Sequence, residues 1–241
     1  MNRPIYRHLA NKAWHSYRRP LLLQRISQMS VIPDILPYMS PTADVTLAFG
    51  KRNVKPGDFV DSRVSEIPTR LGVQVFDKGE RLVTVVVVDP DVPDLKTNAF
   101  KSRCHFLAVN IPISPSSSSL PLSRLSAESQ IVLPWLAPFA QQGTPYHRMS
   151  VFVLQQSEGA TLDYKTTKEF ARREKFNLRS FVDKYDVKPV GVHMFRSQWD
   201  EGTEGVMRRA GLEGWEKVFE RKKPEKLPYK KKDGARYRGF K

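Results

Sequence analysis

The chain has 241 residues, which suits one large domain with extensions and allows a sizeable buried core. Its 40 lysines and arginines against 25 aspartates and glutamates give a net charge of +15, and its single cysteine excludes an intrachain disulfide and a cysteine-based zinc site. No apolar stretch approaches the roughly 20 residues of a membrane span, so we expect a soluble protein without membrane partners.

The excess positive charge is concentrated at the two ends of the chain. Residues 1–33 contain six basic residues and no acidic one, and residues 221–241 contain ten basic and two acidic residues. The stretch between them, 34–220, has 24 basic and 23 acidic residues and is nearly neutral. Terminal arms of one charge sign are typical of proteins that bind a polyanion such as nucleic acid.

The N-terminal residues allow two interpretations that do not exclude each other. Arginines, histidines and serines without acids are typical of a mitochondrial transit peptide. Helical spacing equally indicates a retained basic helix that packs on a partner, through Tyr6, Leu9, Ala13, Trp14 and Tyr17. Pro20 is expected to break or restart this helix, because proline lacks the N–H group. The later prolines at 33, 37 and 41 predict an extended linker.

From Val45 the apolar pattern changes to the two-residue period of β-strands. Short β-branched runs bounded by Gly, Pro, Asp or Asn predict strands, with the sequences VTLAFG, LGVQVF, LVTVVVV, HFLAVNIPI and MSVFVL. Between Val83 and Val88 only Thr84 is polar, so both faces of this strand should be covered, as in the centre of a sheet. These short strands together predict a β-sandwich.

Irregular and helical segments follow in the second half. Residues 112–123, rich in Pro and Ser, predict a surface loop, and its serines have no neighbouring base that would make a nucleophile. We expect short helices at 166–176 and 177–185, a strand at 189–199 and a final helix at 203–219. That helix should use Val206, Ala210, Trp215, Val218 and Phe219. Beyond Pro224 the composition predicts an extended arm.

Polar residues stand at the ends of three predicted strands. Asp89 and Asp91 leave one strand, His105 opens the next, and His147 and Arg148 open another. If these ends meet, they form a small polar pocket at the rim of the sandwich. The alternative is structural: a buried aspartate is usually an acceptor, and Asp91 with Arg148 would make an ordinary bidentate ion pair.

Three ordered motifs around these residues resemble the phosphatidylethanolamine-binding-protein family. They read VVVVDPDVP, CHFLAVNIP and GTPYHRMSVFVL, and the resemblance covers roughly residues 45–220. It implies an antiparallel β-sandwich with helices at its edge and an anion pocket for a phosphorylated head group. Carried over by position, Asp89, His105 and His147 would line that pocket, while Asp91 and Arg148 would form its supporting pair.

The chain departs from the family pattern where backbone should approach the phosphate. Ala137 and Phe139 stand in place of two glycines, and a phenyl ring adds bulk where glycine admits close approach. Arg103 and Cys104 replace an aromatic residue and a first histidine. We therefore interpret the site as a vestigial pocket without a small-molecule ligand, cofactor or metal, in which polar residues hold strands together.

One branch of this superfamily matches better, namely the ribosomal branch found in the large subunit of fungal mitochondrial ribosomes. The similarity lies in the basic leading segment YRHLANKAWHSYRRPLLLQRI, the segment PWLAPFAQQGTPYHR, and a tail rich in Lys, Arg and Tyr. It implies a place in the central protuberance of the mitoribosome, in the mitochondrial matrix, among other ribosomal proteins and ribosomal RNA. It also implies a basic segment at 1–44, a sandwich domain at 45–220 and a basic arm at 221–241.

The expected RNA contacts are cations of both arms. They are Arg18, Arg19, Arg25, Lys230, Lys231, Lys232, Arg236 and Arg238, with Tyr237, Tyr229 and Phe240 available for stacking on bases. A free regulator that binds anionic head groups is the alternative function. A hydrolase is not expected, because Cys104 and His105 should point to opposite faces of their strand.

Overall fold

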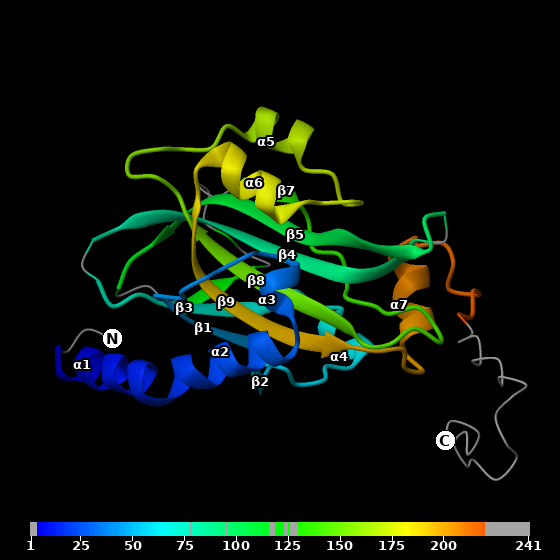
Figure 1. Ribbon diagram of the computed structural model, residues 1–241, viewed down its shortest axis with the longest axis horizontal. Coiled ribbons are helices and arrows are strands. Elements are labelled where there is room, and N and C mark those ends of the chain that lie inside the picture. Colours follow the sequence, from blue (N-terminus) through cyan, green and yellow to red (C-terminus); the bar gives the residue numbers. More distant parts are fainter. Residues whose placement is uncertain are drawn as a thin grey trace, which may run out of the picture.

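Two antiparallel sheets packed face to face form the protein, with helices along the outer side of the larger sheet (Figure 1). The computed structural model describes residues 4–77, 79–94, 96–115, 119–122, 125 and 130–219. The expected C-terminal arm lies outside these residues, as do Tyr229, Lys230, Lys231, Lys232, Arg236, Tyr237, Arg238 and Phe240. The prediction of a mainly β fold with peripheral helices is confirmed.

The larger sheet has five strands in the order β7-β5-β4-β8-β9. Their bounds are Gln130–Leu133 for β7, Ala99–Ile113 for β5, Arg81–Asp94 for β4, His147–Gln155 for β8 and Lys188–Ser197 for β9. The central place predicted for the valine-rich strand is confirmed, because β4 pairs with β5 on one side and β8 on the other.

The smaller sheet has four strands in the order β2-β1-β3-β6. They are Arg52–Val54 (β2), Asp44–Phe49 (β1), Arg70–Gln74 (β3) and Ser119–Pro121 (β6). The prediction that 112–123 is only a surface loop was wrong at both ends, since β5 runs to Ile113 and β6 pairs with β3. Strands β2, β6 and β7 are too short to show an alternating pattern in sequence.

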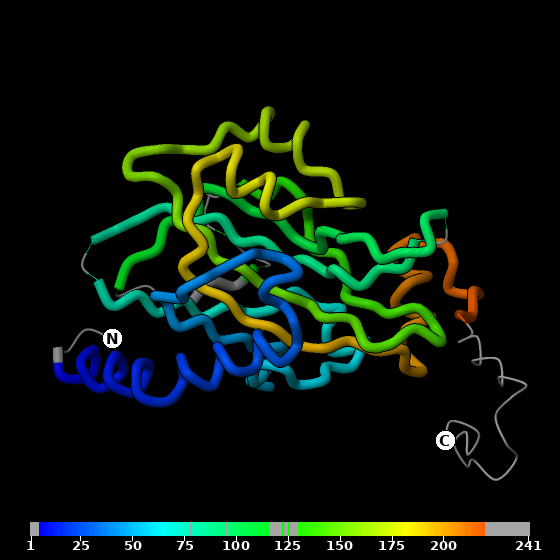
Figure 2. The backbone as a smooth tube through the Cα atoms, in the orientation of Figure 1, coloured from blue at the N-terminus to red at the C-terminus, as the bar shows by residue number. Residues whose placement is uncertain are grey.

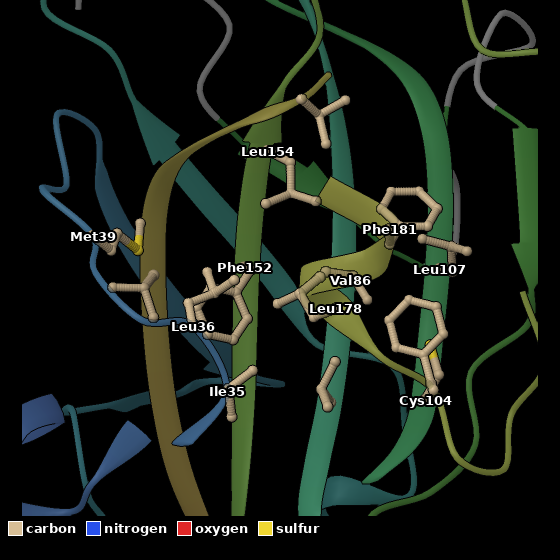
Figure 3. Packing of buried hydrophobic residues seen from close by; sticks show 14 of the residues in the cluster. Ile35, Leu36, Met39, Val86, Cys104, Leu107, Phe152, Leu154, Leu178 and Phe181 are labelled. Atoms are coloured by element: carbon tan, nitrogen blue, oxygen red, sulfur yellow. The ribbon is translucent and has the colours of Figure 1, made fainter. Parts of the chain in front are cut away.

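The two faces of β4 belong to two separate parts of the core. Val83, Val85 and Val87 face the smaller sheet, whereas Val86 and Val88 face the helical layer. Figure 3 shows Val86 on this second side, in the same cluster as Leu178 and Phe181 of a helix. A strand buried on both faces explains why its sequence is apolar without alternation.

The N-terminal residues form a nearly continuous helical rod. It consists of α1 (Pro4–Ala13), the π-helical stretch η1 (Trp14–Arg18) and α2 (Arg19–Gln28). Of the expected break or restart at Pro20, the structure shows the restart: α2 begins at Arg19, and the helix widens just before the proline, where the Arg19 N–H bonds the Trp14 carbonyl. A π turn thus accommodates the ring and the missing N–H of Pro20 without ending the helix.

The segment expected to be an extended linker packs against the larger sheet. After the short α3 (Val31–Asp34), the buried side chains of Ile35, Leu36 and Met39 enter the core beside Phe152 (Figure 3). The prolines are compatible with this irregular backbone path, and the burial of the three apolar side chains holds the segment in place. The boundary at residue 44 stays a prediction, and residues on both sides of it share one core.

The remaining helices are short. They are α4 (Ser62–Ser65), α5 (Tyr164–Phe170), α6 (Leu178–Tyr185) and α7 (Thr203–Arg209). The final helix expected to reach residue 219 was too long, because Gly211 adopts the left-handed conformation and the Leu212 N–H bonds the Met207 carbonyl. Val218, expected in its apolar face, is exposed. Within the described residues no helix is long and apolar enough to cross a bilayer.

Candidate functional site

Asp89 lies at the end of the buried part of β4, where the pairing with β5 is irregular. Its side chain is fully buried, and its Oδ1 accepts the Asp91 N–H at 2.9 Å. Its Oδ2 accepts a hydrogen bond from His147 Nδ1 at 2.8 Å. The predicted meeting of these strand ends is therefore present in the structure.

The side chain of His147 contacts Thr144 as well as Asp89. Thr144 Oγ1 donates to the Gln141 carbonyl at 2.8 Å, and His147 Nε2 lies 3.2 Å from the same hydroxyl. His147 thus links the Asp89 carboxylate of β4 to the residues that precede β8.

The electrostatics of Asp89 follow from these contacts. Burial alone would raise the pKa of the carboxyl, but the charge and hydrogen bond of His147, with help from His105 and the Asp91 N–H, hold it below its ordinary value. The aspartate is ionised at neutral pH and serves as an acceptor for strand β8.

His105 is neutral in the same cluster. Its Nδ1 donates to the Leu136 carbonyl at 3.0 Å, while Nε2 lies 3.9 Å from Asp89 Oδ2 and has no hydrogen-bond partner in the described part of the chain. Burial lowers the pKa of His105 to about 4, against the opposing effect of Asp89. An imidazole of this kind is held in place by the backbone and has no proton to give to a ligand at Nε2.

Phe139 packs against this cluster. It is 2% exposed, its ring centroid lies 6.0 Å from that of His105, and the Arg103 guanidinium lies 4.9 Å from the Phe139 ring centre. Asp89 and His105 are fully buried and His147 is 1% exposed. An anion in solution thus has no exposed surface of these three residues to bind.

Asp91 and Arg148 form the bidentate pair that the alternative interpretation predicted. Arg148 Nε donates to Asp91 Oδ2 at 2.8 Å and Nη2 donates to Oδ1 at 2.7 Å. The remaining terminal nitrogen, Nη1, donates to the Met29 carbonyl at 2.8 Å and to Asp34 Oδ2 at 2.7 Å. The hydrogen bonds with Asp91, and to a smaller extent the one with Asp34, raise the pKa of Arg148. Through its bonds to Met29 and Asp34, Arg148 joins the N-terminal segment to the sandwich.

The N-terminal arginines expected to contact RNA differ in their surroundings. Arg18 forms an ion pair with Asp44, and Arg19 donates to the Pro41 carbonyl at 3.1 Å and to Ser40 Oγ at 2.9 Å. Arg25 is exposed. The first two hold the helical rod to the sandwich, and RNA contact by the three arginines stays a prediction.

The acidic partners Asp34 and Asp44 were not foreseen as members of any site. They are the first two acidic residues of the sequence, directly after the acid-free stretch 1–33. This position in the sequence was the signal that could have identified them, because an intramolecular ion pair of the basic N-terminal segment needs an acidic residue nearby. In the described part of the chain, no three His, Cys, Asp or Glu side chains are grouped as metal ligands.

Comparisons with known proteins agree with this architecture. A family model described as "Phosphatidylethanolamine-binding protein" matches residues 41–190. Among solved structures, a phosphatidylethanolamine-binding protein from Plasmodium vivax has a TM-score of 0.59 at 17% identity, covering 74% of this chain and 97% of that one. Carboxypeptidase Y inhibitor, in complex with its cognate proteinase, has a TM-score of 0.60 at 12% identity, covering 77% and 99%.

Two curated relatives match in sequence. Large ribosomal subunit protein mL38 of Schizosaccharomyces pombe is 32% identical over 210 residues, which are 86% of this chain and 66% of the relative. Putative odorant-binding protein A5 of Drosophila melanogaster is 26% identical over 133 residues, 54% of this chain and 58% of the relative. The described sandwich and the matched motifs together show that the chain belongs to the phosphatidylethanolamine-binding protein family.

Proposed function

We propose that the protein is a structural constituent of the mitochondrial large ribosomal subunit, located in the central protuberance. The observation that carries the proposal is the alignment with Large ribosomal subunit protein mL38, which takes in 86% of this chain. The family model matches only residues 41–190. The likeness to the ribosomal protein therefore extends into flanking segments that the sandwich alone does not account for.

The closed polar cluster supports a structural role. Its carboxylate is already paired with His147, and Phe139 packs against His105. A binding protein for a free anion needs an accessible donor, whereas a scaffold needs rigid strand ends. This cluster provides rigid strand ends and no accessible donor.

The charge distribution supports contact with ribosomal RNA. The nearly neutral segment 34–220 contributes the rigid block, and the basic arm 221–241 is proposed to cross RNA. Each phosphate that a lysine or arginine neutralises releases counterions, so retention on RNA should fall steeply as salt rises. Neighbouring large-subunit proteins would cover other faces of the block.

A catalytic role has no support among the described residues. Cys104 and His105 leave their strand on opposite sides, since Cys104 lies in the helix-facing core while His105 points toward Asp89. Burial raises the pKa of the Cys104 thiol to about 12, so no thiolate is present at neutral pH.

Sucrose-gradient fractionation of mitochondrial lysate tests the proposal. We expect the chain in the large-subunit peak and its movement to lighter fractions after the particle is dissociated. Recovery only at the top of the gradient would refute a ribosomal role. The alternative function, binding of a free head group, predicts saturable binding of phosphoethanolamine that is lost in His147→Ala, and the buried cluster predicts no such binding.

A further inference from the structure

Helix α1 is oriented with its apolar side away from the protein. Ile5, Tyr6, Leu9 and Tyr17 of the rod are 63%, 53%, 53% and 68% exposed. Residues 5, 9 and 13 follow one another along a single helix face, and Tyr17 of η1 continues it over the π turn. This outward stripe, made of Ile5, Tyr6, Leu9, Ala13 and Tyr17, is about 18 Å long at the helical rise of 1.5 Å per residue.

The opposite face of the same helix is turned inward although it is more polar. It contains Arg7 and Asn11, and Trp14 of η1 follows them at the spacing of one helix face. Arg7 Nε, Asn11 Oδ1 and Trp14 Nε1 are all shielded from water and have no hydrogen-bond partner among the described residues. A helix that faced only its own domain and water would be expected to have the reverse orientation.

The rod packs against the sandwich along its second half. Trp14 is 1% exposed and stacks on Phe76 with ring centroids 6.4 Å apart, and Leu22 and Ile26 continue the buried face. Arg18 and Arg19 bond to residues 40–44. These contacts fix the direction of the outward stripe, and Figure 2 shows the backbone of the rod running from the N-terminal end of the molecule along one edge.

We propose that the outward stripe docks into an apolar groove with an acidic rim on a neighbouring protein. The apolar side chains require an apolar partner surface, because interfaces with nucleic acid are polar and rich in positive charge. Lys12 is exposed beside the stripe, and residues 4–28 contain five lysines and arginines and no acidic side chain. Charge complementarity therefore places carboxylates around the groove.

This inference deepens the proposed function by assigning the N-terminal rod to a protein neighbour and leaving RNA contact to the C-terminal arm. The inference rests on the proposed function only in taking the mitochondrial large ribosomal subunit as the assembly that contains the neighbouring protein. The geometry of the stripe would present the same surface to a protein partner in any assembly.

Site-specific photo-crosslinking in cells tests the docking. The full chain would have p-benzoylphenylalanine in place of Leu9 or Tyr17, with Ile67, which is 65% exposed on the sandwich, as the matched control. We expect an adduct at both rod positions that resists ribonuclease and disappears with protease. A ribonuclease-sensitive adduct, no adduct, or equal yield at the control position would overturn the proposal.

Competition between chains gives a second, quantitative test. A Leu9→Gln/Tyr17→Gln chain and a wild-type chain would be expressed together, and we expect the double variant to be depleted about tenfold in the assembled particle, the effect of losing a small group of interface anchors. Ile67→Gln should compete equally with wild type. Since all three sites are exposed, we expect the variants to fold like wild type, which their urea midpoints would check. Equal incorporation of the double variant would overturn the docking.

The two proposals fail in different ways. A chain that stays at the top of the gradient but forms protein adducts at positions 9 and 17 would refute the ribosomal role and leave the docking surface intact. A chain that sediments with the large subunit without those adducts would refute the docking surface alone.

Discussion

Replacing Arg148 by methionine should destabilise the sandwich and release the N-terminal segment. Methionine keeps much of the stem volume but removes four side-chain hydrogen bonds, two to Asp91, one to the Met29 carbonyl and one to Asp34. Of its bonds to described residues, the Asp91 carboxylate would keep only the one from the Arg148 backbone N–H, at 2.9 Å.

The expected loss can be worked from the exposure of each partner. The side chains of Arg148 and Asp91 are 14% and 18% exposed, so breaking their pair should cost about 3 kcal/mol, the lower end of the range for buried pairs, because some water reaches the carboxylate. The Asp34 side chain is 47% exposed, and its bond should contribute about 0.5 kcal/mol. Asp34→Asn is therefore the matched control.

Urea unfolding of the full chain, followed by tryptophan fluorescence, measures both losses. The double variant Arg148→Met/Asp91→Leu should lose about 2 kcal/mol less than the two single variants together, since it leaves no buried charge without a partner. Hydrogen exchange at residues 29–36 should accelerate in Arg148→Met. Equal stability of Arg148→Met and Asp34→Asn, or strict additivity in the double variant, would refute the reasoning.

Three further predictions concern buried side chains. Burial lowers the pKa of His105 to about 4, so between pH 6.5 and 4 the unfolded chain takes up a proton at this residue that the folded chain does not. The free energy of unfolding should therefore fall by about 3 kcal/mol as the pH falls through that window. His105→Asn, which can keep the bond to the Leu136 carbonyl, should flatten the dependence of urea midpoints on pH, and parallel curves would count against it. Phe139→Ala should lower the free energy of unfolding by about 3 kcal/mol, and a loss below about 1 kcal/mol would mean that the ring is not packed. Cys104, whose pKa burial raises to about 12, should react with maleimide at pH 8 only after unfolding, and rapid labelling of the native chain would contradict its burial.

Much of the sandwich could be predicted because strand pattern is a local property. The apolar run of β4 reflects burial on both faces, and the family motifs correctly placed Asp89 beside His147 and Asp91 beside Arg148. Short elements were missed for the same reason, since three or four residues show no period. Helix α7 was predicted too long because apolar spacing continued after Gly211, where the backbone turns.

The charge separation between arms and core, the strand periods and the family motifs were determined by the sequence alone, because each depends on residue types and spacing along the chain. The tertiary structure alone decided that Phe139 packs beside the neutral His105, that Arg148 reaches a carbonyl 119 residues away at Met29, and that α1 turns its apolar stripe outward. Burial and hydrogen-bond partners depend on segments that are distant in sequence, so local pattern could state which side chains are present but not which of them would meet.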